Sequence, residues 1–315
     1  MSAPRKWGIT GASGPFGSGV VRTLVQQHGI SPQQLVLVSR SPDRLDEWAA
    51  SGADVRRADF DNGTALTEAL RGVDRLLMIS TSRVGGRAPQ HRTAIEAARD
   101  AGVRHVVYTS FVGKAQYPAI SVREHRFTED LLQASGMAWT ILRNSQYAEA
   151  MRDAGGPAAL RSGTWISSSG NGRIAMVSRE DCIRSAAAVM AGSGHEGHIY
   201  DITGPALVTF AEVCALIAKI TGHPIDYRPV DDEGLYAFFD RCGIPRSTQD
   251  NLNVDGYGWC SDEMVSFEAS LRAGAFAVLS DHVKQLTGQA PESIDSFLAR
   301  HRDTMLRAAG LPQTP

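Results

Sequence analysis

Short apolar runs alternate with segments of helical periodicity through the first half of the chain. Such runs are typical of strands buried in a parallel sheet, whereas apolar residues three or four apart favour amphipathic helices. Strands are expected at Lys6–Thr10, Gln34–Ser39, Asp54–Arg57, Arg75–Ser80, His105–Ser110, Trp139–Arg143 and Gly197–Thr203. Helices between them are expected at Gly17–Gln27, Pro42–Ser51, Gly63–Arg71, Gln90–Ala101 and Val122–Ser135. This alternation predicts an α/β fold with a doubly wound, mostly parallel Rossmann sheet.

After Gly204 the pattern changes to helices with few strands. Thr209 and Glu212 have the spacing of a capping box, which predicts a helix over Ala211–Thr221. The remaining elements are expected to be a strand at Pro224–Val230 and helices at Asp231–Cys242, Glu263–Ala273, Ser280–Thr287 and Glu292–Ala309. The sequence thus predicts a Rossmann domain over 1–150, its sheet completed by about 174–204, and a smaller, mainly helical, substrate-binding lobe over 205–315. Segment 151–173, with its serine- and glycine-rich stretch Ser162–Gly172, is expected to be a loop of that lobe.

Composition narrows the class of function. The 32 Lys and Arg residues nearly balance the 34 Asp and Glu residues, so no global field recruits nucleic acid or an anionic membrane. No apolar run reaches membrane-spanning length, and no secretory signal pattern precedes the first strand. The four cysteines form no CxxC pair, and the nine histidines form no HExxH motif, so no metal is expected. We expect a cytoplasmic protein that acts on a small molecule, and the long helix at Glu292–Ala309 leaves room for a homodimer.

A glycine-rich turn joins the first strand to the first helix. Such a turn lets backbone N–H groups approach a pyrophosphate, whose charge is favoured at a helix N-terminus. Gly11 permits the tight turn, Gly14 the close approach and Gly17 the packing of the helix on the sheet. The turn predicts a dinucleotide site whose contacts are Thr10, Gly11, Ser13, Gly14, Pro15, Phe16 and Gly17.

The second strand ends at Ser39 and Arg40, where a domain that prefers NAD usually carries an acidic residue. A guanidinium instead offers several donors to a 2′-phosphate, so NADP(H) is the expected cofactor, with Ser39 and Arg44 assisting. Asp59 and Phe60 follow the third strand and are expected near the adenine. Ser80, Thr81 and Ser82 end the fourth strand, at the sheet edge where such folds bind ligands.

The spacing GxxGxxG resembles that of the short-chain dehydrogenase/reductase superfamily. Several stretches together resemble its atypical NmrA-like branch, particularly the group of quinone oxidoreductase type 2 and triphenylmethane reductase. These stretches are Gly8–Gly14, Val84–Arg92, Tyr108–Ser110, Glu124-His125 with Thr128-Glu129, Leu142–Asn144 with Tyr147, and Ala191–Tyr200. The resemblance implies a Rossmann fold, NADP(H), an electron-poor acceptor between two lobes, and further cofactor contacts at Gln90, Tyr108 and Thr109.

The Tyr-x-x-x-Lys pair that most short-chain dehydrogenases use for proton transfer is missing, since Tyr117 is followed four residues later by Ser121. By position, Ser110, Asn144 and Tyr147 are expected to face the nicotinamide and to act on the acceptor. Each has an alternative role: Ser110 in satisfying backbone groups, Asn144 as a cap and Tyr147 in the core. In the second lobe, five aromatic residues are candidates to sandwich a flat acceptor: Tyr236, Phe238, Phe239, Tyr257 and Trp259. Tyr236 and Phe239 share one helical face with Leu235, which favours core packing for that group.

The leading hypothesis is an NADPH-dependent oxidoreductase that reduces a quinone, dye, imine or other electron-poor conjugated acceptor. A quinone or cationic dye accepts hydride without an obligatory enzyme acid, which fits the missing tyrosine–lysine pair. The absence equally fits the alternative, a non-catalytic NADP(H)-sensing regulator of the NmrA type. A third hypothesis is a biosynthetic reductase or epimerase with a larger substrate.

Overall fold

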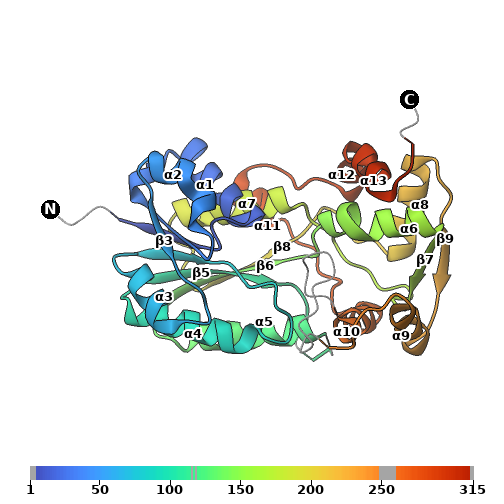
Figure 1. Ribbon diagram of the computed structural model, residues 1–315, viewed down its shortest axis with the longest axis horizontal. Coiled ribbons are helices and arrows are strands. Elements are labelled where there is room, and N and C mark those ends of the chain that lie inside the picture. Colours follow the sequence, from blue (N-terminus) through green and yellow to red (C-terminus); the bar gives the residue numbers. More distant parts are fainter. Residues whose placement is uncertain (1–4, 115, 118, 248–259, 313–315) are drawn as a thin grey trace.

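The first two-thirds of the chain form a parallel sheet with strand order β3-β2-β1-β4-β5-β6-β8, in which every neighbouring pair is parallel (Figure 1). The computed structural model describes residues 5–114, 116, 117, 119–247 and 260–312. The strands are β1 (Trp7–Thr10), β2 (Leu35–Ser39), β3 (Asp54–Arg57), β4 (Arg75–Met78), β5 (His105–Phe111), β6 (Ala138–Asn144) and β8 (His198–Ile202). The predicted doubly wound Rossmann sheet is confirmed.

Helices cover both faces of this sheet, as Figure 1 shows. One face carries α1 (Pro15–Gln26), α2 (Asp46–Ala50), α7 (Arg179–Ala191) and α11 (His282–Thr287). The other carries α3 (Gly63–Leu70), α4 (Arg87–Asp100) and α5 (Ile120–Gln133). Each face has its own apolar core, because side chains of a strand alternate between the two sides. Leu37 and Val107, for example, pack on one side and Val38 and Tyr108 on the other.

Helix α7 was not predicted, and a buried arginine holds its C-terminal end. The Arg75 guanidinium, 5% exposed, donates to the carbonyls of Val189, Met190 and Gly192. These are the orphan carbonyls that every helix leaves at its C-terminus. A side chain from β4 therefore joins α7 to the sheet across more than a hundred residues of sequence.

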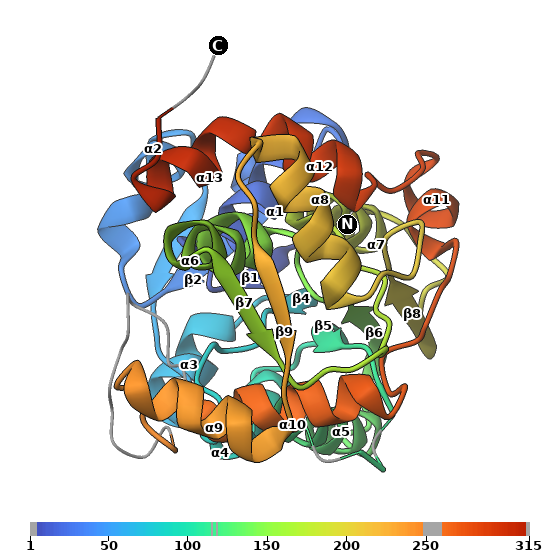
Figure 2. The ribbon, with the colours of Figure 1, turned by 90° about the vertical axis from the view of Figure 1, so that its right-hand side faces the viewer.

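The rest of the chain packs beyond the carboxyl ends of the strands (Figure 2). It contains α6 (Gly156–Ser162), β7 (Thr164–Ser167), α8 (Phe210–Thr221), β9 (Asp226–Pro229), α9 (Asp232–Arg241), α10 (Ser261–Arg272), α12 (Ile294–Arg300) and α13 (Arg302–Ala309). Figure 2 shows β7 and β9 between the pair α9 and α10 and the helices α8, α12 and α13. The helical C-terminal region is confirmed, and the predicted capping box at Thr209 is formed. The domain boundary at residue 150 stays a prediction.

Two sequence expectations for this region are wrong. The stretch Ser162–Gly172 is not all loop, because Thr164–Ser167 forms β7, and segment 151–173 also contains a π turn and α6. The partner of β7 is β9, about sixty residues away, so local periodicity carries no sign of the pairing. The expected helix Glu292–Ala309 is two helices, since His301 leaves helical geometry (φ −105°, ψ 12°) and its ring packs on Phe297.

In the part of the chain described, no helix is both long and apolar enough to cross a bilayer. The same residues hold no group of three or more His, Cys, Asp or Glu side chains placed to bind a metal ion.

Candidate functional site

The turn between β1 and α1 has the geometry that a pyrophosphate requires. Gly11 has φ +62°, a conformation that favours glycine. A Cβ at Gly17 would lie 2.4 Å from the Gly11 carbonyl oxygen, so only glycine allows this approach of helix and turn. Gly14 stands at the N-cap position of α1 without a side-chain cap, and the first turn holds no acidic residue. The helix N-terminus therefore offers free donors and a favourable dipole to an anion.

The side chains of this turn divide between solvent and core. Pro15, the first residue of α1, is exposed, whereas Phe16 is 9% exposed and packs in the core. The Ser13 and Ser39 hydroxyls lie 2.6 Å apart, which links the turn to the end of β2. Polar groups from the β1–α1 turn and from β2 thus meet at the predicted cofactor edge.

Arg40 extends into solvent beyond β2. Its side chain is 77% exposed, and its Nε lies 3.8 Å from the Asp59 carboxylate. Its backbone carbonyl accepts a hydrogen bond from Arg57, so the residue itself is anchored while the guanidinium stays accessible. Asp59 is partly exposed, whereas the Phe60 ring is 8% exposed and packs edge-on to His91. The exposed guanidinium suits a 2′-phosphate.

Three consecutive backbone N–H groups beyond β4 are bound by side chains from three other elements. The N–H of Ile79 donates to Thr10 Oγ1 at 3.0 Å, that of Ser80 to Thr109 Oγ1 at 2.9 Å and that of Thr81 to His91 Nε2 at 3.2 Å. The Thr10 and Thr109 hydroxyls, both nearly buried, are thus engaged in holding the end of β4. Ser82 follows on the surface.

Within the described part of the chain, several polar atoms along this edge are buried without a hydrogen-bond partner. They are Thr81 Oγ1, Gln90 Oε1, Asn144 Oδ1 and Ser145 Oγ. Leaving such an atom unpaired is unfavourable, so a group that supplies hydrogen bonds there gains binding energy. Together with the glycine turn and Arg40, these atoms fit a bound dinucleotide that runs along the carboxyl ends of the strands.

Tyr108 does not reach this edge. Its side chain is wholly buried, and its hydroxyl lies 2.7 Å from His125 Nδ1 on the α5 side of the sheet. Burial raises the pKa of Tyr108 and lowers that of His125, so both groups are neutral. The Tyr108 side chain is therefore part of the core on the α5 side, and a cofactor contact by this residue stays a prediction.

Ser110 is also turned away from the edge. Its hydroxyl donates to Glu129 Oε1 at 2.5 Å, and Glu129 is 2% exposed between Arg126 and Arg143. The Ser110 proton is therefore committed to a carboxylate of α5. The alternative structural role fits this geometry better than a direct hydrogen bond to an acceptor.

Asn144 and Tyr147 form a pair where β6 ends. The Asn144 amide donates to the Tyr147 hydroxyl at 3.1 Å, so the phenol keeps its own proton for another acceptor. Burial raises the pKa of Tyr147, which keeps the phenol neutral. Sheet register places Asn144 beside Phe111, the last residue of β5, so the pair lies next to the end of that strand.

The aromatic candidates in the second lobe have separate outcomes. Phe239 is buried with Leu235 and Val265, and Tyr236 and Phe238 pack against that cluster. Core packing therefore accounts for them. Tyr257 and Trp259 lie outside the described residues.

A family model described as NAD(P)H-binding matches residues 11–191, from the glycine turn through α7. The chain belongs to the NAD(P)H-binding family. It is 38% identical over 244 residues to quinone oxidoreductase 2 of Escherichia coli (strain K12), covering 78% of this chain and 84% of that protein. It is 29% identical over 309 residues to an NmrA-like family domain-containing oxidoreductase of Aspergillus flavus, covering 94% and 95% of the two chains.

Solved structures agree with this assignment. The NADPH complex of the E. coli quinone oxidoreductase QOR2 superposes with a TM-score of 0.84 at 34% identity, covering 93% of this chain and 99% of that one. The triphenylmethane reductase of Citrobacter sp. with NADP(H) has a TM-score of 0.80 at 24% identity over 94% and 99% of the chains, which shows the shared fold. The protein is an NADPH-dependent oxidoreductase of this family.

The sequence did not identify the residues whose side chains hold the strand ends of the site in place. Arg87, His91 and Glu129 appeared within stretches that resemble the family, and none of them was expected to hold the backbone of the site in place. Their partners lie 6 to 37 residues away in sequence, on other elements. No local pattern signals such contacts. The Val84–Arg92 stretch, rich in polar residues at the start of a helix, was the one hint available.

Proposed function

We propose that this NADPH-dependent reductase passes hydride to a quinone or another electron-poor conjugated acceptor, such as a dye or an imine. NADPH, when bound, supplies the hydride, and the protein supplies position and hydrogen bonds. The observation that carries the proposal is the Asn144–Tyr147 pair in a chain that has no Tyr-x-x-x-Lys sequence. Without a lysine to lower its pKa, Tyr147 suits hydrogen bonding to an acceptor oxygen or nitrogen better than proton transfer.

The cofactor contacts that we propose follow the carboxyl edge of the sheet. The glycine turn would hold the pyrophosphate, Ser39 and Arg40 the 2′-phosphate, and Asp59 with Gln90 the adenine, where the unpartnered Gln90 Oε1 can accept from an amino group. Ser80, Thr81 and Ser82 would contact the cofactor beyond β4. The Thr10 and Thr109 side chains hold the segment beyond β4 in place, and the Ser110 side chain holds the end of β5 against α5.

The test is oxidation of NADPH on addition of a panel of quinones, triphenylmethane dyes and cyclic imines. We expect turnover with at least one acceptor class and none with simple ketones, whose reduction needs an acid. NADPH binding measured by fluorescence accompanies each assay. Tight binding without turnover across the panel would contradict the proposal and favour the NADP(H)-sensing alternative.

A further inference from the structure

The backbone of Thr81 is held on both sides by side chains of α4. Its N–H donates to His91 Nε2 at 3.2 Å, and its carbonyl accepts from Arg87 Nε at 2.7 Å. Both residues are largely buried, His91 wholly so. Because Thr81 lies just past the end of β4, these two bonds fix the direction in which the chain leaves the sheet.

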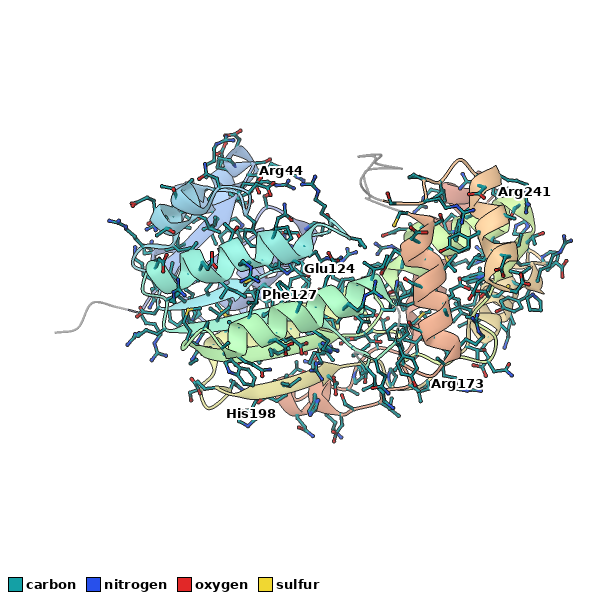
Figure 3. All side chains as sticks on the ribbon, turned by 90° about the horizontal axis from the view of Figure 1, so that it is seen from below. Arg44, Glu124, Phe127, Arg173, His198 and Arg241 are labelled. Carbon is teal, nitrogen blue, oxygen red and sulfur yellow. The ribbon has the colours of Figure 1, made fainter. Side chains whose placement is uncertain are left out.

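Arg87 is itself fixed by a carboxylate of α5. Glu124 accepts from the Arg87 backbone N–H at 3.0 Å, and its other oxygen lies 3.5 Å from the guanidinium. The two side chains are 10% and 12% exposed, and Figure 3 shows Glu124 between α4 and α5. A partly buried ion pair of this kind holds the guanidinium in one orientation. The Thr81 carbonyl is thus bound by a pre-positioned donor.

The hydrogen bonds of His91 define which ring nitrogen carries its proton. Since Nε2 accepts from Thr81, the proton is on Nδ1, which lies 2.9 Å from Thr128 Oγ1. The Thr128 hydroxyl in turn donates to the Glu124 carbonyl at 2.8 Å, so it is free to accept from His91. Burial and the Arg87 charge lower the pKa of His91 to about 3, which keeps the ring neutral, as an accepting Nε2 requires.

One further observation indicates what the held residue does. Thr81 Oγ1 is buried and has no hydrogen-bond partner among the described residues, although its backbone is bound on both sides. A fixed backbone with an unpaired hydroxyl is the arrangement of a group held ready for a ligand.

We propose that His91 and Arg87 are positioning residues that hold the Thr81 backbone so that its hydroxyl and the adjoining Ser80 meet the bound NADPH. Neither residue touches the cofactor. The inference rests on the cofactor contacts proposed above for residues 80–82. It assigns a function to Arg87 and His91, whose side chains are largely buried at the start of α4.

A matched pair of substitutions at His91 tests this role. In His91→Gln the side-chain amide reaches the position of Nε2 and keeps an acceptor for Thr81. In His91→Asn it reaches only the position of Nδ1, which keeps the Thr128 contact and leaves the Thr81 N–H unpaired. We expect NADPH to bind His91→Asn about tenfold more weakly than the parent, and His91→Gln within about threefold.

Amide hydrogen exchange over residues 79–87 gives a readout that does not depend on the cofactor. Faster exchange in His91→Asn than in His91→Gln, at similar melting temperatures and with the expected difference in Kd, supports the proposal. Equal exchange and equal Kd in the two variants would overturn it. Faster exchange in His91→Asn with an unchanged Kd would show that the Thr81 backbone is held there but that residues 80–82 do not contact NADPH, and this outcome rejects the role in cofactor binding.

Arg87→Lys tests the hydrogen bond to the Thr81 carbonyl. It also provides a test if the His91 variants fold poorly. Lysine keeps a positive charge near Glu124. It lacks the Nε–H group with which the Arg87 guanidinium donates to the Thr81 carbonyl. We expect weaker NADPH binding, about fivefold, with kcat at saturating NADPH little changed. A loss confined to kcat or to the melting temperature would contradict the positioning role.

Discussion

The Ser110 hydroxyl donates to the Glu129 carboxylate at 2.5 Å, and this bond ties the end of β5 to α5. Glu129 lies between two guanidinium groups, Arg126 and Arg143, and Arg126 also donates to the carbonyls of Phe111 and Gly113. The network supports the strand end from the face opposite α1 and α7. Ser110, which was expected at the reaction centre, thus supports the site indirectly, because it holds the end of β5 in place.

Glu129→Gln should destabilise the fold strongly. The substitution removes the carboxylate that pairs with both Arg126 and Arg143, and Asp201 attracts these two guanidinium groups less strongly. Charges left poorly compensated in a largely buried site are unfavourable by about 3 kcal/mol. The free energy of unfolding from urea titrations measures the loss. A decrease below about 1 kcal/mol would show that solvent compensates the two guanidinium groups.

Ser110→Ala should lower the stability of the fold and leave the rate of hydride transfer nearly unchanged. We expect a decrease in the free energy of unfolding of about 1 kcal/mol, with kcat for the best acceptor changed less than about threefold. A fall in kcat of about a hundredfold at unchanged stability would restore Ser110 as a catalytic residue.

Arg40→Asp should reverse the cofactor preference. An exposed carboxylate beside Asp59 repels a 2′-phosphate and can accept from a 2′-hydroxyl, so the ratio of NADH to NADPH affinity should rise by about a hundredfold. Arg71→Asp, a charge reversal at another well-exposed arginine, near Glu68, is the matched control and should leave the ratio unchanged. An unchanged ratio in Arg40→Asp would show that the 2′-phosphate binds elsewhere.

Tyr147→Phe should reduce turnover without weakening NADPH binding. The variant removes the phenol proton that the Asn144 bond leaves available, and the expected fall in kcat/KM is about ten- to a hundredfold. Tyr200→Phe removes a hydroxyl that lies 3.0 Å from His195 on the outer strand β8 and should keep parent activity. Equal activity of the two variants would remove Tyr147 from the acceptor site.

Glu268 should make stability depend on pH near neutrality. Burial raises the pKa of its carboxyl from 4.5 to about 7, and the Asp232 charge adds to the rise. The Ser167 hydroxyl and the Ser168 N–H, which donate to the carboxylate, oppose it, and Arg272 lies nearby. Because the folded state holds this proton more tightly than the unfolded state, the stability is full below about pH 4.5 and is lost as pH rises towards 7.

Glu268→Gln should remove that dependence. The amide keeps an acceptor for both serine donors and carries no charge, so the variant should gain up to about 3 kcal/mol relative to the parent between pH 5 and pH 8. Urea unfolding of both proteins at each pH measures the difference between their free energies of unfolding. Groups that titrate in the same way in both proteins do not contribute to this difference. A constant difference across this range would show that the Glu268 carboxyl is already ionised at pH 5.

The sequence by itself determined the sheet and the glycine turn, because both depend on the residue types within one short segment. Apolar runs such as Leu35–Ser39 specify buried strands, and the positions of Gly11 and Gly17 specify a turn that other residues cannot form. The position of Arg40 at the cofactor edge could be predicted for the same reason, because Arg40 directly follows β2.

Only the tertiary structure decided what the side chains at the sheet edge do. Thr10, Ser110 and His91 were equally able to face a ligand or the interior, and their partners Ile79, Glu129 and Thr81 lie on other elements. The pairing of β7 with β9 and the anchoring of α7 by Arg75 likewise join distant segments. A hydrogen bond across the fold depends on where packing places both partners, and a sequence read along one segment at a time contains only one of them.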